Sequence, residues 1–152
     1  MSMQQRVWRF ERLGWYLLSG VMLLALAGVF GRGPLSHAAA SSADGRIQVQ
    51  YARFSRSGVL ESLQIRVKGP SNGQVQVLLD GDLFREASLE TLQPQPQRSR
   101  SEGQGLQLQL GTGTDGTATL YLSLRVEAPG RLQGRVSLGP DSETRFSSFI
   151  YP

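Results

Sequence analysis

The 152-residue chain contains no cysteine and a single histidine, and it has only one long apolar run. Without cysteine there are no disulfides, no thiolate metal ligands and no lipobox cysteine for lipid attachment, so the fold depends on packing alone. Lys68 is the only lysine and Asn72 the only asparagine, and no Asn-x-Ser/Thr sequon occurs. This composition is typical of a GC-rich bacterial coding sequence and favours a protein of the bacterial cell envelope.

The apolar run LGWYLLSGVMLLALAGVFG, from Leu13 to Gly31, is uncharged and 19 residues long. As a helix it would be about 28 Å long, close to the roughly 30 Å hydrocarbon core of a bilayer. Arg6, Arg9 and Arg12 precede it, and positive charge near a membrane segment stays on the cytoplasmic side. The sequence therefore predicts a single-pass helix in the bacterial inner membrane, with a cytoplasmic N-terminus and an extracytoplasmic (periplasmic) C-terminal domain.

A cleaved secretory signal is the alternative to a retained anchor. Ala38, Ala39 and Ala40 form an A-x-A-like site after a basic segment. The apolar run is longer than the usual h-region of about 7 to 15 residues, which favours a retained anchor, and cleavage near Ala40 stays open. The predicted organisation is a cytoplasmic basic segment (1–12), a transmembrane helix (13–31), a tether (32–45) and an extracytoplasmic β domain (46–152).

Beyond the tether, apolar and polar residues alternate with period two, as strands with one buried face require. The alternation is clear in the short segments 47–51, 63–68, 74–79, 106–110 and 132–138, and residues 145–151 are predicted to form the last strand. The longest clean alternation runs from Ala118 to Val126, which predicts a central strand.

Turn residues separate these segments. Asp80-Gly81 is typical of a type I′ hairpin, so we expect residues 82–88 to return as a shorter strand. The segment 93–103 is polar and contains Pro94 and Pro96, which cannot donate to a central ladder, and it is predicted to be a loop or an edge segment.

The small polar residues 36–44 predict a tether rather than a packed element.

About seven to eight strands, with no amphipathic helix among them, indicate an all-β fold. The sequence predicts an antiparallel immunoglobulin-like β-sandwich preceded by a single N-terminal transmembrane α-helix, with a small closed barrel as the alternative.

The sequence contains few residues suited to catalysis. The only histidine, His37, lies in the tether, so no base is available for a hydrolytic triad, and no HExxH, GxSxG or P-loop motif occurs. The closest carboxylate pair, Asp80 and Asp82, is interpreted as turn chemistry rather than a metal site. The sequence therefore predicts no enzyme, no catalytic residue, no cofactor and no metal. The net charge of +4 comes with arginines interleaved with acidic residues, which predicts no nucleic-acid partner.

Two features favour an interaction function. Gly20, Ala27 and Gly31 share one face of the predicted helix, and small residues let another helix approach closely. The last residues, FSSFIYP, place aromatic groups on both faces of a strand. We expect a terminal strand buried on both faces; the alternative is an exposed patch in which Phe149 and Tyr151 contact a partner.

Arg98 and Arg100 are a further candidate contact, for an anionic partner, although such a pair is usually a solvated loop.

The chain also resembles a family of small bacterial proteins with one N-terminal membrane helix and an exported β domain. The matching segments are RFERLGWYLL, FGRGPLS, DGRIQVQYARFSRSG, PQP, GRLQGRVSLG and RFSSFIYP, which together span nearly the whole chain. The resemblance implies an accessory subunit of multi-pass membrane proteins of the YetF type, and it implies no catalytic or ligand-binding residue.

Together these patterns predict a non-enzymatic, membrane-anchored extracytoplasmic interaction module that contacts the bilayer and another envelope membrane protein. The alternative is a module that binds an envelope glycan or another small ligand. A concave pocket lined by Tyr51, Tyr121 or arginine side chains would favour the ligand, and a flat apolar patch would favour the protein partner.

Overall fold

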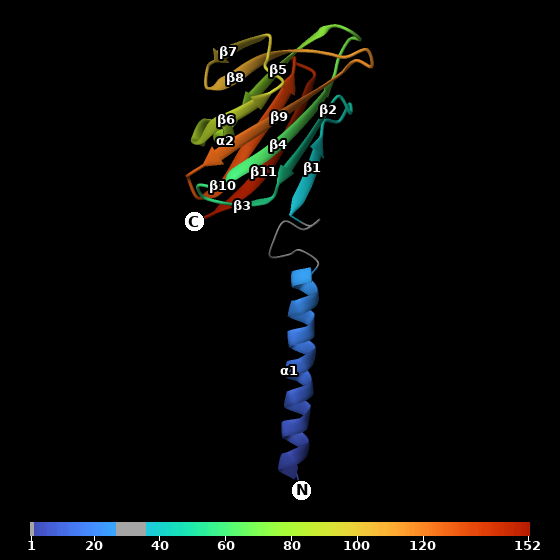
Figure 1. Ribbon diagram of the computed structural model, residues 1–152, viewed down its shortest axis with the longest axis vertical. Helices are drawn as coiled ribbons and strands as arrows, with labels where there is room; N and C mark the ends of the chain where they lie inside the picture. Colours follow the sequence, from blue (N-terminus) through green and yellow to red (C-terminus); the bar gives the residue numbers. More distant parts are fainter. Residues whose placement is uncertain (1, 27–35) are drawn as a thin grey trace. The chain divides into compact units, whose positions relative to one another are not determined.

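The computed structural model of the chain describes residues 2–26 and 36–152, with side chains from residue 11 onward. Two compact units are distinguished, Met1–His37 and Ala38–Pro152. The first unit contains a long helix, and the second contains two β-sheets (Figure 1).

The helix of the first unit, α1, spans Ser2–Leu26. It begins eleven residues before the predicted segment 13–31, and residues 27–31 of that segment lie outside the described residues. Between Leu13 and Leu26 its large apolar side chains are exposed. Among the helices that the structure describes, none has the combination of length and apolarity required to cross a membrane.

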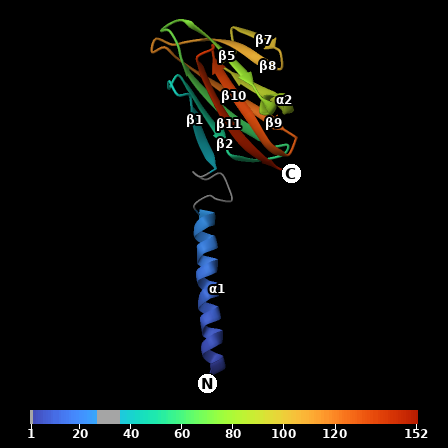
Figure 2. The same ribbon diagram turned by 180° about the vertical axis from the view of Figure 1, so that it is seen from behind.

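The second unit, which we call the β domain, is a sandwich of two sheets (Figures 1 and 2). The five-stranded sheet has the order β1 (His37–Ser41), β2 (Ile47–Ala52), β4 (Leu60–Lys68), β9 (Thr117–Val126), β6 (Ala87–Gln93). The six-stranded sheet has the order β3 (Phe54–Arg56), β11 (Ser142–Tyr151), β10 (Gly130–Leu138), β5 (Gln74–Asp80), β8 (Gly105–Gly111), β7 (Arg98–Glu102). The predicted all-β sandwich is confirmed at this level.

The alternating residues form the core between the sheets. On β9, every second residue from Ala118 to Val126 is at most 7% exposed, and β4 and β6 flank this strand on its two sides. The prediction of a central strand here is therefore confirmed. Leu122 of β9 is opposite Leu63 of β4, so the inward side chains of neighbouring strands align. Each buried aliphatic side chain of this kind stabilises the fold by about 1.5–3 kcal/mol.

The predicted hairpin at Asp80-Gly81 is wrong. β5 already pairs with β10 on one side and β8 on the other, so it has no free edge for a returning strand. Residues Asp82–Glu86 instead form the short helix α2, whose Leu83 is buried and whose Asp82 and Arg85 form an ion pair of 2.5 Å. The next strand, β6, begins only at Ala87 and pairs with β9 in the other sheet.

The predicted tether also differs from the structure, because residues 37–41 form the edge strand β1. The turn that joins β1 to β2 is closed by two hydrogen bonds of 3.0 Å, from Ser42 N to Ile47 O and from Ile47 N to Ser42 Oγ. The strand was missed because alanines give no apolar and polar alternation, although Ala40 packs against the core.

The prediction of a loop or edge segment over 93–103 is confirmed, since it contains the edge strand β7. A cis peptide bond joins Gln93 to Pro94. At the tip of the β7–β8 hairpin, Gly103 has φ of 62°, a conformation that glycine adopts without steric cost.

Candidate functional site

Three aromatic rings form one exposed cluster on the six-stranded sheet, which we call the aromatic surface. It consists of Phe54 on β3 and Phe149 and Tyr151 on β11, whose exposed fractions are 51%, 41% and 48%. The Tyr151 ring is central: its centroid lies 6.2 Å from that of Phe54 in a stacked arrangement and 5.0 Å from that of Phe149 in an edge arrangement. Such ring pairs prefer these geometries and stabilise one another.

The backbone fixes these rings in place. β3 pairs parallel with β11, which puts Phe54 opposite Phe149 in register. Phe149 N donates to Arg53 O at 2.8 Å, and Ser57 N donates to Tyr151 O at 2.7 Å. Hydrogen bonds at both ends of β3 therefore hold the aromatic surface as one preformed unit.

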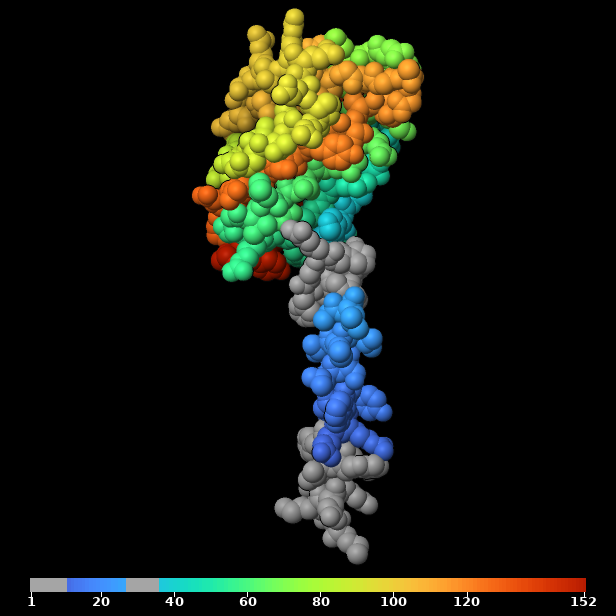
Figure 3. All heavy atoms as spheres, in the orientation of Figure 1, coloured from blue at the N-terminus to red at the C-terminus, as the bar shows by residue number. Residues whose placement is uncertain are grey.

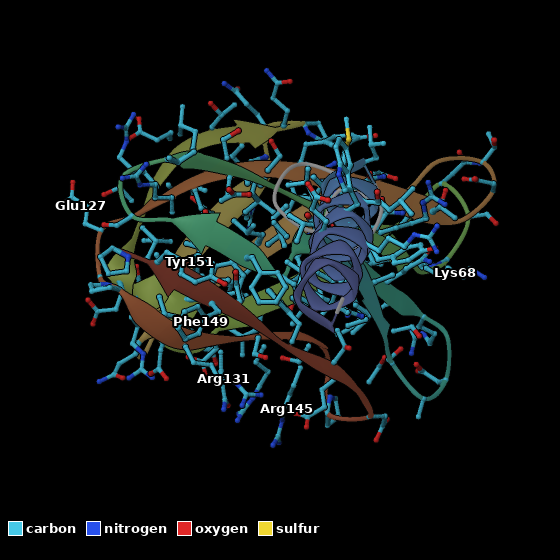
Figure 4. All side chains as sticks on the ribbon, turned by 90° about the horizontal axis from the view of Figure 1, so that it is seen from below. Lys68, Glu127, Arg131, Arg145, Phe149 and Tyr151 are labelled. Atoms are coloured by element: carbon cyan, nitrogen blue, oxygen red, sulfur yellow. The ribbon has the colours of Figure 1, made fainter. Side chains whose placement is uncertain are left out.

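Arg131 borders this surface, and Arg145 lies four residues before Phe149 on β11. Arg131 on β10 is opposite Phe149 in register, and its Nη2 lies 3.4 Å from Ser147 Oγ. Arg145 forms an ion pair of 2.8 Å with Glu143. Figure 4, which views the β domain from the end where β3 and the C-terminus lie, shows the side chains of Arg131 and Arg145 extending away from the ribbon.

The expectation of a terminal strand buried on both faces is wrong. Phe146 and Ile150 are buried, at 5% and 1% exposure, but Phe149 and Tyr151 on the other face are exposed. The six-stranded sheet packs against the core with one face only, so alternate residues of β11 face outward. The alternative prediction, an exposed aromatic patch, agrees with this arrangement.

The second candidate contact lies elsewhere. Arg98 and Arg100 are on β7, and strands β10, β5 and β8 separate β7 from β11 in the same sheet. The structure therefore does not bring these arginines together with Phe149 and Tyr151. Instead they line a groove of about 380 Å³, which we call the polar groove, together with Gln76, Ser99, Gln107 and Gln109.

The two tyrosines considered for a ligand pocket lie on different parts of the β domain. Tyr51 is half-buried, with its ring centroid 4.9 Å from that of Phe146. It lines a cavity of about 30 Å³ between the sheets, which has room for about one water molecule. Tyr121 is 54% exposed on the five-stranded sheet. The expected ligand pocket was to be lined by Tyr51, Tyr121 or arginine side chains. The polar groove is lined by arginines, but neither tyrosine is among its lining residues.

One of the three residues of the predicted helix face lies within the described residues. Gly20 lies in α1, and a side chain at that position would meet nothing within 4 Å. Ala27 and Gly31 lie outside the described residues.

The two carboxylates considered for a metal site have other partners. Asp80 Oδ1 accepts a hydrogen bond of 2.7 Å from Gly81 N, and Asp82 is the ion-pair partner of Arg85. Within residues 2–26 and 36–152, no group of three or more histidine or carboxylate side chains is arranged to hold a metal ion.

Sequence reasoning missed Phe54 and the hydrogen-bonded group around Asp44. Phe54 was not singled out, because a three-residue strand gives no periodic signal. Asp44 was assigned to the tether, but its carboxylate accepts hydrogen bonds from Ser42 Oγ, Arg46 N (3.2 Å) and Ser142 Oγ (3.0 Å). These hydrogen bonds, with that of Ser42 the largest cause, lower the pKa of Asp44. Only the bond to Arg46 N, an Asx-type turn, has a local sequence signal.

Comparison with known proteins adds no assignment, because no family and no curated protein matches the chain.

Proposed function

We propose that the chain is a non-enzymatic interaction module, anchored in the bacterial inner membrane by one N-terminal helix, with the β domain on the extracytoplasmic side. In this proposal it serves as an accessory subunit of another envelope membrane protein. The observation that carries the proposal is the aromatic surface of Phe54, Phe149 and Tyr151, which leaves three large rings exposed side by side.

The chemistry of this surface favours a protein partner. Aromatic residues and arginine are enriched at protein interfaces, and they supply a large share of binding energy there. The rings are held by paired strands, so little conformational entropy is lost when a partner binds them. Exposed apolar side chains that gather in one place, rather than scatter singly, are typical of interaction sites.

The proposed anchor is supported by the sequence and by one structural observation. The run from Leu13 to Gly31 is uncharged and follows three arginines. The described part of this run exposes its large apolar side chains, which a lipid environment accommodates. Gly20, Ala27 and Gly31 would give the helix a second contact with the partner.

The strand order supports an immunoglobulin-like form of the sandwich. The order β2-β4-β9-β6 corresponds to strands A, B, E and D of that fold, and β11-β10-β5 corresponds to G, F and C. β1, β3 and the β7–β8 hairpin would then be additions to the common framework. The fold itself assigns no activity, so the functional proposal depends on the surface.

The test is co-purification from membranes. The full chain is expressed at native level, solubilised in mild detergent and captured, and associated proteins are identified by mass spectrometry. The double variant Phe149→Ala/Tyr151→Ala should lose a specific membrane partner, because it removes two of the three rings. Tyr121→Ala, which removes an equally exposed ring from the other sheet, is the matched control and should retain it.

The helix is tested in the same assay. Ala27→Ile should weaken the association without affecting insertion, because isoleucine blocks close helix approach and is itself favourable in hydrocarbon. A partner that survives both Ala27→Ile and the ring variants, or the absence of any specific partner, would contradict the proposed accessory function.

A further inference from the structure

The polar groove lies on the outward face of the six-stranded sheet, at the edge formed by β7. In Figure 3 the hairpin of β7 and β8 belongs to the yellow surface at the upper end of the β domain. The register of β5, β8 and β7 forms the polar groove: Gln76 is opposite Gln109, and Gln109 is opposite Arg98. Gln107 is opposite Arg100 one step along the hairpin. Three strands therefore present a continuous row of polar side chains.

Two positive charges line the groove; Glu102, on the same face of β7, is two residues beyond Arg100 and is not part of the lining. Arg98 and Arg100 are exposed, and none of the ion pairs found among the described residues includes either of them. No carboxylate lines the groove. Arg98 and Arg100 lie on the same face of β7, and their Cα atoms are two residues, or about 7 Å, apart along the strand. An anionic group that enters the groove meets two sets of donors suited to carboxylate, phosphate or sulfate oxygens.

The glutamines add a second kind of recognition. Gln74 Nε2 donates to Gln97 Oε1 at 2.8 Å, and Gln109 Nε2 donates to Gln74 Oε1. This network limits the rotation of Gln109 before any ligand binds. Side-chain amides both donate and accept hydrogen bonds, as the hydroxyl groups of a saccharide do, and they therefore complement a polyhydroxylated ligand.

Edge protection explains only part of this arrangement. Charged side chains on an edge strand discourage pairing with other chains, which accounts for arginines on β7. It does not account for glutamines on β5 and β8, since both strands are paired on two sides. The lining contains no aromatic ring on which a nucleic-acid base would stack. Its volume of about 380 Å³ falls within the range of small-ligand sites.

We propose that the polar groove binds an anionic saccharide, that is, a sugar unit that carries hydroxyl groups together with a carboxylate, phosphate or sulfate group. The arginines bind the charged group and the glutamine amides bind the hydroxyls. This site is independent of the proposed accessory function, because the aromatic surface lies at the opposite edge of the same sheet.

The first test is direct titration. The full-length protein in uncharged detergent micelles is titrated calorimetrically with trigalacturonate and with trisaccharides bearing sulfate or phosphate; the comparison identifies the preferred anion. Neutral maltotriose and a hexaglutamate peptide serve as controls. We expect saturable binding of at least one anionic saccharide, weakened by added salt, and much weaker binding of both controls. Equal binding of maltotriose would overturn the charge requirement, and equal binding of hexaglutamate would overturn the saccharide assignment. Absence of binding by all three anionic saccharides would overturn the site itself.

The second test uses charge-matched variants. Arg98→Gln/Arg100→Gln should lower the affinity at least about tenfold. Arg131→Gln/Arg145→Gln removes the same charge from the same outward face, on β10 and β11 outside the groove lining, and should change the affinity less than about twofold. Equal losses in the two variants would mean long-range attraction rather than binding in the groove, and would overturn the proposal.

A third variant separates charge from hydroxyl recognition. Gln76→Leu removes one amide that would bind a hydroxyl group, so it should weaken saccharide binding. It keeps both arginines, so the salt dependence of binding should be unchanged. Unchanged affinity in this variant would leave a purely electrostatic contact and contradict the saccharide assignment. All substituted side chains are exposed, and circular dichroism verifies that each variant is folded. If Arg98→Gln/Arg100→Gln does not fold, Arg98→Lys/Arg100→Lys replaces it. This variant should also bind the saccharide less tightly than the wild type, because lysine keeps the charge but lacks the planar guanidinium group. Wild-type affinity in this variant would overturn the role of the guanidinium groups.

Discussion

The ring of Phe146 on β11 covers Gly134, its cross-strand partner on β10. A Cβ atom at residue 134 would lie 2.4 Å from Cζ of Phe146 and 2.8 Å from two further ring atoms. The ring has little freedom to move, because its centroid lies 4.9 Å from that of Tyr51 and 6.3 Å from that of Phe84. Gly134 thus creates the space into which the largest core side chain of β11 packs.

We therefore expect Gly134→Ala to destabilise the β domain. Replacing a strand glycine with alanine ordinarily gains up to about 1 kcal/mol, through the entropy of the unfolded chain. Here the steric conflict with Phe146 should outweigh that gain and lower the free energy of unfolding by about 1–3 kcal/mol. Urea denaturation of residues 36–152 measures the change. Gln133→Ala, at the exposed neighbouring position, should change it by less than about 0.5 kcal/mol.

The register of the central strand gives a second prediction. Leu122 on β9 is 2% exposed, and Ser123 faces the opposite side of the sheet. Leu122→Ala should cost about 2–5 kcal/mol through the lost burial and the cavity that remains. Ser123→Ala should cost less than about 0.5 kcal/mol. Similar effects at the two positions would mean that the face assignment of β9 is wrong.

The elements that sequence analysis predicted correctly are those whose signal is local. The alternation from Ala118 to Val126 requires one buried face wherever the strand pairs, so burial and centrality followed from it. The short helix α2 was missed because Asp80-Gly81 is a strong hairpin signal on its own. Only the pairing of β5 on both sides, by β8 and β10, excludes the hairpin. Distant pairing overrides a local turn preference here.

The candidate site was predictable to a smaller extent. Phe149 and Tyr151 were identified from the terminal run, but their exposure depends on which face of β11 meets the core. Phe54 joins them only through the parallel pairing of β3 with β11, which no local pattern signals. Arg98 is part of a groove only because β5 and β8 place glutamines beside it. Surfaces assembled across strands follow from topology rather than from any single segment.

Asp44 gives a pH-dependent prediction. Its pKa is lowered in the folded state, chiefly by the hydrogen bond from Ser42 Oγ. A carboxyl group whose folded pKa is depressed stabilises the fold fully above its unfolded pKa of about 3.9, and loses that contribution as the pH falls through the folded pKa. Asp44→Asn should therefore destabilise the β domain at neutral pH, and the difference from the wild type should shrink below about pH 4. Denaturation of both proteins between pH 2.5 and 7 tests this.

Asp44 also accepts a hydrogen bond from Ser142, 98 residues away at the start of β11. Ser142→Ala removes that bond but leaves the one from Ser42, and should keep most of the pH dependence. If the stability difference between Asp44→Asn and the wild type is constant across the pH range, ionisation of Asp44 does not stabilise the fold.

The final prediction concerns the N-terminal segment. Cleavage near Ala40 would cut within β1, which spans His37–Ser41 and whose Ala40 packs against the core. A mature chain beginning at Ser41 would lack this edge strand of the five-stranded sheet. We therefore expect the full-length mass to persist in the membrane fraction, and a reporter that is active only outside the cytoplasm, fused after Pro152, to be active. Recovery of a soluble chain beginning at Ser41 would contradict the retained membrane anchor, and only the prediction that the β domain is exported would remain. In that case the remaining β2 edge should be less protected from amide hydrogen exchange than in the intact chain, because its outer backbone groups would have lost their partners.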